Sequence, residues 1–195
     1  IAGLGAWRTG KLASFFASPN AVPSAANLAP IDSPAFAEKP TINTLSISAE
    51  NRQAPIYQGR PVHIVEADPE VLKQIPPETY QKSKSELADL AVKLADNPLR
   101  SDDWMRVAFI KRFYHDYLGA RVVYEYLNRV NDGDPVPFYN LGSLYGYYLN
   151  EPAKAIPKFE AAIQRDSVHA SFYIGFADFY REVMNDSPSA EKVLL

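Results

Sequence analysis

The 195-residue chain lacks cysteine and has few histidines. Without cysteine there is no disulfide, no zinc–thiolate site and no thiol nucleophile. The histidines are His63, His115 and His169, and none of them has a second histidine three to five residues away. This spacing excludes a helical zinc site of the metalloprotease type.

An excess of positive charge is also lacking, because 20 Lys and Arg stand against 23 Asp and Glu and leave a net charge of −3. Without a Lys/Arg cluster, nucleic acid is not an expected partner. No GxSxG, P-loop or GxGxxG motif occurs. Residues 131–135, NDGDP, resemble only the start of a calcium loop, and the Asp102–Asp103 pair fits the start of a helix. We therefore expect a protein without catalytic activity, metal or cofactor.

The first residues, IAGLGAW, are apolar but too few to cross a bilayer, which takes roughly 20 residues. Arg8 and Lys11 follow them, as basic residues follow a leader peptide or a membrane anchor. Two interpretations stay open for residues 1–18: a mobile hydrophobic end, or a segment at a membrane surface, in the cell envelope or an organelle. In the second, the membrane contacts would be Trp7, Leu12, Phe15 and Phe16.

Proline concentrates in the first part of the chain, where ten of the sixteen prolines lie within residues 1–78. Because proline fixes φ and lacks an N–H, residues 19–78 are expected to form an extended arm. Alternation of side chains in residues 44–50 and 61–67 predicts two short strands, at most one hairpin, which would need a surface to pack on. Asp68 before Pro69 predicts the start of a short helix.

From Pro77 the apolar residues recur at helical spacing. Tyr80, Leu87, Leu90, Ala91 and Leu94 fall on one face of a helix. Asn97-Pro98 should end this helix, and Ser101 should cap the next one. Residues 79–195 are therefore expected to form a helical domain.

A spacing of 34 to 35 residues then repeats three times. Large side chains at 104, 138 and 173 are each followed three residues later by an apolar one, and then by Ala108, Gly142 or Ala177. A second set of small residues keeps the same step. These are Ala120, Ala155 and Ala190, each followed four residues later by Tyr124, Phe159 or Leu194.

The pattern has a direct physical reading. A small residue on each of two helices lets the helices approach closely, and the large residues beside it fill the seam. One such helical hairpin cannot bury its apolar face alone, so the copies are expected to stack into an all-α solenoid of about three repeats. An ordinary helical bundle is the alternative.

The spacing resembles the tetratricopeptide repeat family over residues 100–195, with a degenerate or capping unit at 79–99. The middle copy carries the family pattern in Phe138, Leu141, Gly142, Tyr145, Ala155, Phe159 and Ala162. The departures are Lys111 in place of a tyrosine, Asp132 and Ser167 in place of closing prolines, and Pro157 inside a second helix.

The resemblance implies a concave groove, lined by the first helices, that holds a peptide or a helix of a partner protein. Eighteen of the 24 aromatic residues lie between residues 104 and 180, more than the repeat cores need; the surplus either lines this groove or an oligomer face, or packs against residues 41–78. The groove positions carried over are Met105, Arg106, Phe109, Arg112, Phe113, Tyr139, Asn140, Ser143, Tyr147, Ile174, Asp178 and Arg181.

The sequence pattern is compatible with two functions. The first is a non-catalytic assembly or adaptor subunit that scaffolds or anchors a membrane-associated complex through its groove and its N-terminal arm. The second is a self-assembling structural protein, a filament or lattice in which solenoids join head to tail.

Overall fold

Helices make up all the regular secondary structure in residues 54–195, the part of the chain that the computed structural model describes. Residues 1–18, the first part of the arm and the strand expected at 44–50 lie outside the described residues. The helices are α2 (Pro69–Leu72), α3 (Pro77–Asp96), α4 (Ser101–Phe113), α5 (Tyr117–Val130), α6 (Pro135–Tyr147), α7 (Pro152–Arg165), α8 (Ala170–Glu182) and α9 (Ser187–Leu194).

Several helix starts follow the predicted chemistry. Asp68 caps α2 by accepting a hydrogen bond from the amide of Glu70, and Pro69 takes the first helical position, as expected. The helix over 77–96 ends at Asn97, also as expected. The cap predicted for Ser101 was wrong. Ser101 is already the first residue of α4 and Arg100 precedes it without a side-chain cap, so Asp102 and Asp103 in the first turn supply the favourable charge.

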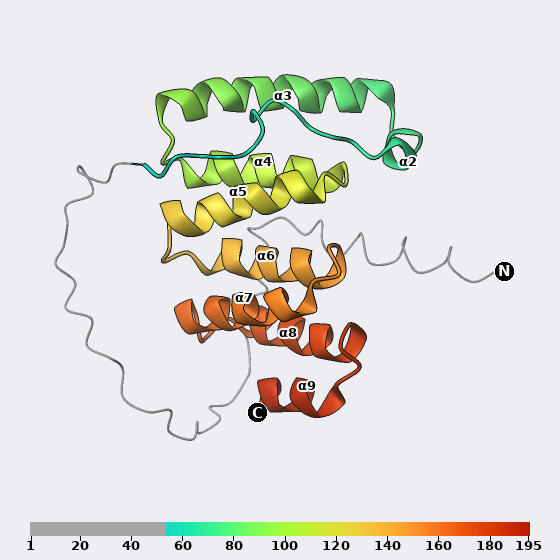
Figure 1. Cartoon of the computed structure of the whole chain (residues 1–195), viewed down its shortest axis with the longest axis vertical. Coiled ribbons are helices and arrows are strands. Elements are labelled where there is room, and N and C mark those ends of the chain that lie inside the picture. Colours follow the sequence, from blue (N-terminus) through green and yellow to red (C-terminus); the bar gives the residue numbers. More distant parts are fainter. Residues whose placement is uncertain (1–53) are drawn as a thin grey trace, which may run out of the picture. The chain divides into compact units, whose positions relative to one another are not determined.

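Three helical hairpins, α4–α5, α6–α7 and α8–α9, stack in chain order below α3 (Figure 1). A short turn joins the two helices of each hairpin, so they run antiparallel. Consecutive hairpins touch where α5 packs on α6 and α7 packs on α8, and α3 packs on α4. The predicted packing of neighbouring helices is therefore confirmed.

Small residues lie at the helix crossings, as the spacing predicted. A Cβ added at Gly142 would lie 3.1 Å from the Phe159 ring and 3.3 Å from the carbonyl oxygen of Ala155. The close approach of α6 and α7 thus depends on the absence of a side chain at 142. All six residues of the two small sets are buried, namely Ala108, Gly142, Ala177, Ala120, Ala155 and Ala190.

The turns inside the three hairpins share one backbone conformation. His115, Asn150 and Asn185 are all left-handed, with φ of 60°, 54° and 52°, and they are 35 residues apart. Asn and His are among the residue types that tolerate this conformation. The acidic residues that follow accept backbone hydrogen bonds from the small residues of the second helices, in the pairs Asp116–Ala120, Glu151–Ala155 and Asp186–Ala190.

The strand expected at 61–67 was wrong. Residues 54–67 form an extended segment, hereafter the strap, which runs along α4 and α5 without a partner strand among the described residues (Figure 1). Val62, Val65 and Ala67 pack against the core whereas Ile64 is exposed, so burial does not alternate. The physical reason is that Lys111 of α4 bonds the carbonyl of Ile64 and Asp116 of the α4–α5 turn bonds the amide of Glu66, where a partner strand would otherwise bond them.

Candidate functional site

Among the first helices of the three hairpins, α6 contacts both α4 and α8. The Asn140 amide nitrogen lies 3.8 Å from the sulfur of Met105, which joins α6 to α4. The ring of Tyr147 meets Phe179 edge-on at 6.2 Å, and α6 contacts α8 directly. We call the exposed surface of α4, α6 and α8 the first-helix face.

Exposed aromatic and aliphatic side chains occur on this face. Phe109 is 40% exposed, Tyr147 and Tyr148 are each 36% exposed, and Ile174 is 53% exposed. Arg112 lies over the Tyr148 ring, 5.6 Å from its centroid. Side chains of this kind, aromatic with arginine beside them, are typical anchors in protein interfaces.

Arg106 ties the face to α3. Its guanidinium makes two hydrogen bonds to the carboxylate of Glu86, at 2.5 and 2.9 Å, and this contact lowers the pKa of Glu86. Arg106 also lies 5.3 Å from the centre of the Phe109 ring. The position of Arg106 is thus set by α3, next to an exposed aromatic ring.

Other predicted groove residues lie inside the stack. Ser143 is buried, and the Tyr139 ring packs against Phe159 and Phe172 at 5.5 and 5.1 Å. Burial, with the nearby carboxylate of Asp178, raises the pKa of Tyr139. Phe113 is half-buried and meets Tyr114 edge-on at 4.9 Å. Tyr139 and Ser143 consequently contribute to packing between repeats more than to the surface.

The remaining predicted positions lie at the α6–α8 boundary. Burial raises the pKa of Tyr147, and the carboxylates of Glu182 and Asp178 act in the same direction. Asp178 also forms an ion pair with Arg181, one turn further along α8. The structure therefore brings Tyr139, Tyr147 and Asp178 together, while Phe109 and Arg106 lie at the α3–α4 end of the face.

A buried ionic cluster lies where the strap crosses α4 and α5. Lys111 is fully buried, its Nζ lies 3.5 Å from Asp116 Oδ2, and it donates a hydrogen bond to the carbonyl oxygen of Ile64. Burial lowers the pKa of Lys111, and Asp116 opposes this shift. Arg60 of the strap donates to Asp116 Oδ1 at 2.7 Å and also pairs with Glu66.

Asp116 joins the strap to the helices. Besides Lys111 and Arg60, it accepts hydrogen bonds from the amides of Gly119 at 2.9 Å and Glu66 at 3.3 Å. The first of these bonds caps α5 and the second holds the strap. One carboxylate therefore satisfies a lysine, an arginine and two backbone amides.

An aromatic cluster anchors the other end of the strap. The Tyr57 ring lies 4.6 Å from Trp104 and 5.4 Å from Tyr126, which belong to α4 and α5. Burial raises the pKa of Tyr57 to about 12, and Asp116 acts in the same direction. A Cβ added at Gly59 would lie 2.8 Å from Val122, so the strap backbone approaches α5 closely at this glycine.

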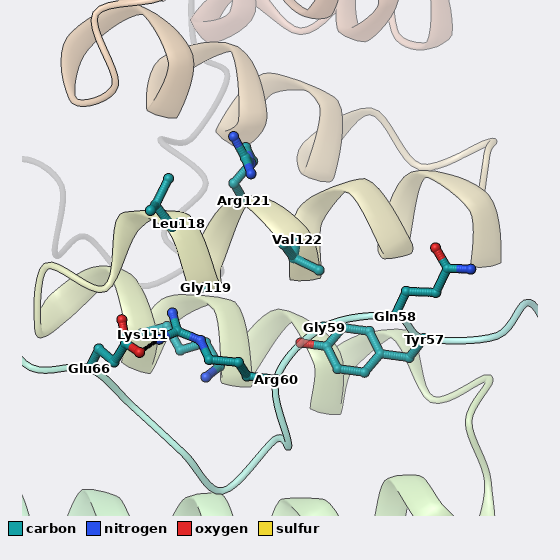
Figure 2. Close-up of a pocket in the computed structure, with 10 residues that line it drawn as sticks. All are labelled: Tyr57, Gln58, Gly59, Arg60, Glu66, Lys111, Leu118, Gly119, Arg121 and Val122. Atoms are coloured by element: carbon teal, nitrogen blue, oxygen red, sulfur yellow. Dashed lines mark ion pairs between the residues drawn. The ribbon is translucent and has the colours of Figure 1, made fainter.

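A pocket of about 330 Å³ remains between the strap and α5 (Figure 2). Arg60 and Glu66 line it from the strap, and Leu118, Gly119 and Arg121 line it from α5. One residue signals this site in the sequence, namely Lys111 at a position where the repeat pattern has a tyrosine. Nothing in the sequence indicates that Lys111 would contact a segment about fifty residues earlier in the chain.

No group of three or more acidic or histidine side chains within residues 54–195 is close enough to hold a metal ion. His115 instead pairs with Asp68, with Nδ1 and Oδ2 3.2 Å apart. Among the described helices none has the length and apolarity to cross a membrane.

No protein-family model matches the chain, and no curated protein matches its sequence.

Proposed function

We propose that this chain is a non-catalytic adaptor of tetratricopeptide-repeat type, which recruits a partner protein on its first-helix face. The observation that carries the proposal is the set of exposed aromatic and aliphatic side chains on the first helices, which are Phe109 on α4, Tyr147 and Tyr148 at the end of α6, and Ile174 on α8. Apolar side chains gathered on one face of a repeat array favour binding of a peptide segment or a helix.

The repeat class is supported by three features that recur at 34 to 35 residues. These are the buried small residues at the crossings, the left-handed residue in each turn and the acidic residue after it. Repeats of this length built from helical hairpins are characteristic of the tetratricopeptide family.

Self-assembly is the second candidate, and exposed Met184 and Leu194 at α9 favour it. Head-to-tail joining would place the α9 end of one copy, with Met184 and Leu194, against the α3 end of the next copy. Val92 is the only large apolar side chain exposed on α3, and charged residues such as Asp89 and Lys93 are exposed around it. A polar outer face is what closes a repeat array, so we favour the adaptor.

Attachment to a membrane-associated complex, at a site outside the cytoplasm or in an organelle, completes the proposal. Its support is the sequence of residues 1–18, with Trp7, Phe15 and Phe16 beside Arg8 and Lys11. The arm would then hold the repeats near the membrane while their face binds the partner. Vesicle flotation of the full chain, with a Trp7→Ala/Phe15→Ala/Phe16→Ala variant beside it, tests this part: loss of flotation is expected for the variant.

The recruitment claim is tested with the full chain as bait in an extract of the source organism. A Phe109→Ala/Tyr147→Ala variant should lose the proteins that the wild type captures, because both anchors are removed. Val168→Ala is the matched control, since Val168 is 90% exposed in the turn before α8, away from the face. Equal capture by all three proteins would contradict the proposal, and long assemblies in sedimentation would favour self-assembly instead.

A further inference from the structure

The strap contacts α4 and α5 in the way that an extended peptide contacts a receptor. The ring of Tyr57 lies beside Trp104 and Tyr126. Three residues after Tyr57, Arg60 donates a hydrogen bond to Asp116. The backbone then bonds to receptor side chains, through the carbonyl of Ile64 and the amide of Glu66. Side-chain anchors combined with main-chain hydrogen bonds are the usual basis of peptide recognition.

The contact between the strap and the helices is incomplete. Ile56 and Ile64 are 78% and 41% exposed, and the pocket of about 330 Å³ lies between Arg60, Leu118 and Arg121. A segment held at separate points over a hollow buries less apolar surface than a packed helix does. Segments with few buried contacts open at a lower free energy than the core around them.

The charges under the strap remain paired when the strap leaves, although Lys111 loses its hydrogen bond to the carbonyl oxygen of Ile64. Asp116 keeps its ion pair with Lys111 and its hydrogen bond from Gly119, both of which belong to the helices and their turn. Loss of Arg60 therefore does not leave a lone buried charge, which would be a severe penalty. Opening uncovers the rings of Trp104 and Tyr126, which a new aromatic side chain could cover, and the apolar surface on which Val62, Val65 and Ala67 pack.

We propose that this surface is a second peptide-binding site, separate from the first-helix face, and that the strap is its occupant in cis. The strap opens while α4 and α5 stay folded. The site then accepts an extended segment of a partner protein that carries an aromatic residue and, three residues later, an arginine. The covalent connection gives the strap a high effective concentration, so the partner segment must compete with it.

Hydrogen exchange of the full chain tests the opening directly, without any substitution. The amides of Glu66 and Asp68 are bonded to Asp116 and to the carbonyl of Tyr114. They should exchange at least tenfold faster than the central amides of α4 and α5, at a rate that low urea concentrations do not change. Equal rates for the strap and these helices would overturn the proposal, because the strap would then open only when the domain unfolds.

Peptide binding tests the site itself. A labelled peptide of residues 54–68 is titrated into the wild type and into a Tyr57→Ala/Arg60→Ala variant, whose own strap is weakened. We expect at least tenfold stronger binding to the variant, and none by a peptide in which both anchors are alanine. Lys192→Ala, an exposed position on α9 outside both proposed binding sites, is the control and should bind as the wild type does. Equal binding to the wild type and the variant, with circular dichroism showing both folded, would overturn the proposal. If the straps of two chains exchange at high protein concentration, the partner segment is the strap of a second copy.

Discussion

Lys111 and Asp116 form a buried ion pair, with Nζ and Oδ2 3.5 Å apart, in the turn region of the first hairpin. Lys111 stands where the other repeats carry Tyr145 and Tyr180. The substitution of a cation for a tyrosine makes this hairpin different from the other two, since it requires a carboxylate and a carbonyl oxygen nearby. Asp116 supplies the carboxylate from within the hairpin, and the strap supplies the carbonyl of Ile64.

Removal of Asp116 should therefore destabilise the domain strongly. An Asp116→Ala substitution leaves Lys111 buried without a counter-ion and uncaps α5, and loss of one partner of a buried pair costs about 3–5 kcal/mol. Asp132→Ala, in an exposed turn, should change the free energy of unfolding by less than about 0.5 kcal/mol. Urea unfolding of the two variants checks this. Equal stabilities would show that the ionic cluster does not hold the fold.

Stability should fall at alkaline pH. The pKa of Tyr57 rises from 10.0 to about 12 on folding, so the folded state holds the phenol proton more tightly than the unfolded state. The stabilisation from this group is present below pH 10 and is lost as the pH rises from 10 to 12. Burial of Lys111 acts in the opposite direction below its usual value of 10.5, because the unfolded state then binds the extra proton.

Tyr57→Phe is the control for the alkaline loss. It keeps the ring against Trp104 but has no titrating group, so its stability should decline less between pH 10 and 12 than that of the wild type. The free energy of unfolding at several pH values measures this. If the free energy of unfolding declines equally in both proteins, the loss comes from other tyrosines, such as Tyr124, whose pKa is also raised by burial.

The helix crossings should not accept larger side chains. Ala155 is fully buried where α7 meets α6, whereas Ala153 on the same helix is exposed. Ala155→Leu should lower the free energy of unfolding by about 1–3 kcal/mol through overpacking, and Ala153→Leu should leave it nearly unchanged. Urea denaturation distinguishes the two, and a tolerated leucine at 155 would show that the seam is loosely packed.

Glycine 175 should also resist substitution. A Cβ at Gly175 would lie 1.8 Å from the Tyr139 hydroxyl, and the Tyr139 ring cannot move easily because it packs on Phe159 and Phe172. Gly175→Ala should thus lower the melting temperature. The matched control is Gly133→Ala in an open turn, where the nearest atom to an added Cβ is 3.8 Å away. Equal melting temperatures for the two variants would mean that Tyr139 is free to move toward the surface.

The repetitive part of this fold could be predicted because the same pattern of small and large residues recurs in three copies of the repeat. Small residues at 108, 142 and 177 each need a close helix neighbour, and the period of 34 to 35 residues locates the hairpins without knowledge of any contact. The turns carry a further signal in the sequence. His115, Asn150 and Asn185, each followed by an acidic residue, mark the same left-handed position in every repeat.

The strap and the exact surface could not be predicted, because they depend on contacts between distant segments. The alternation in residues 61–67 is compatible with a strand. The segment is not a strand because Lys111 bonds the carbonyl of Ile64 and Asp116 bonds the amide of Glu66, and these contacts cannot be read from the sequence. Periodicity likewise places Phe109 and Tyr139 on equivalent helix faces. Their difference in exposure arises because Phe172 of the next repeat covers Tyr139.

Recruitment of a partner on the first-helix face can be measured by hydrogen exchange of the full chain with and without the protein it captures. We expect slower exchange in α4, α6 and α8, around Phe109, Tyr147 and Ile174, with α7 and α9 unchanged. Protection confined to the second helices, with none on α4, α6 or α8, would contradict it.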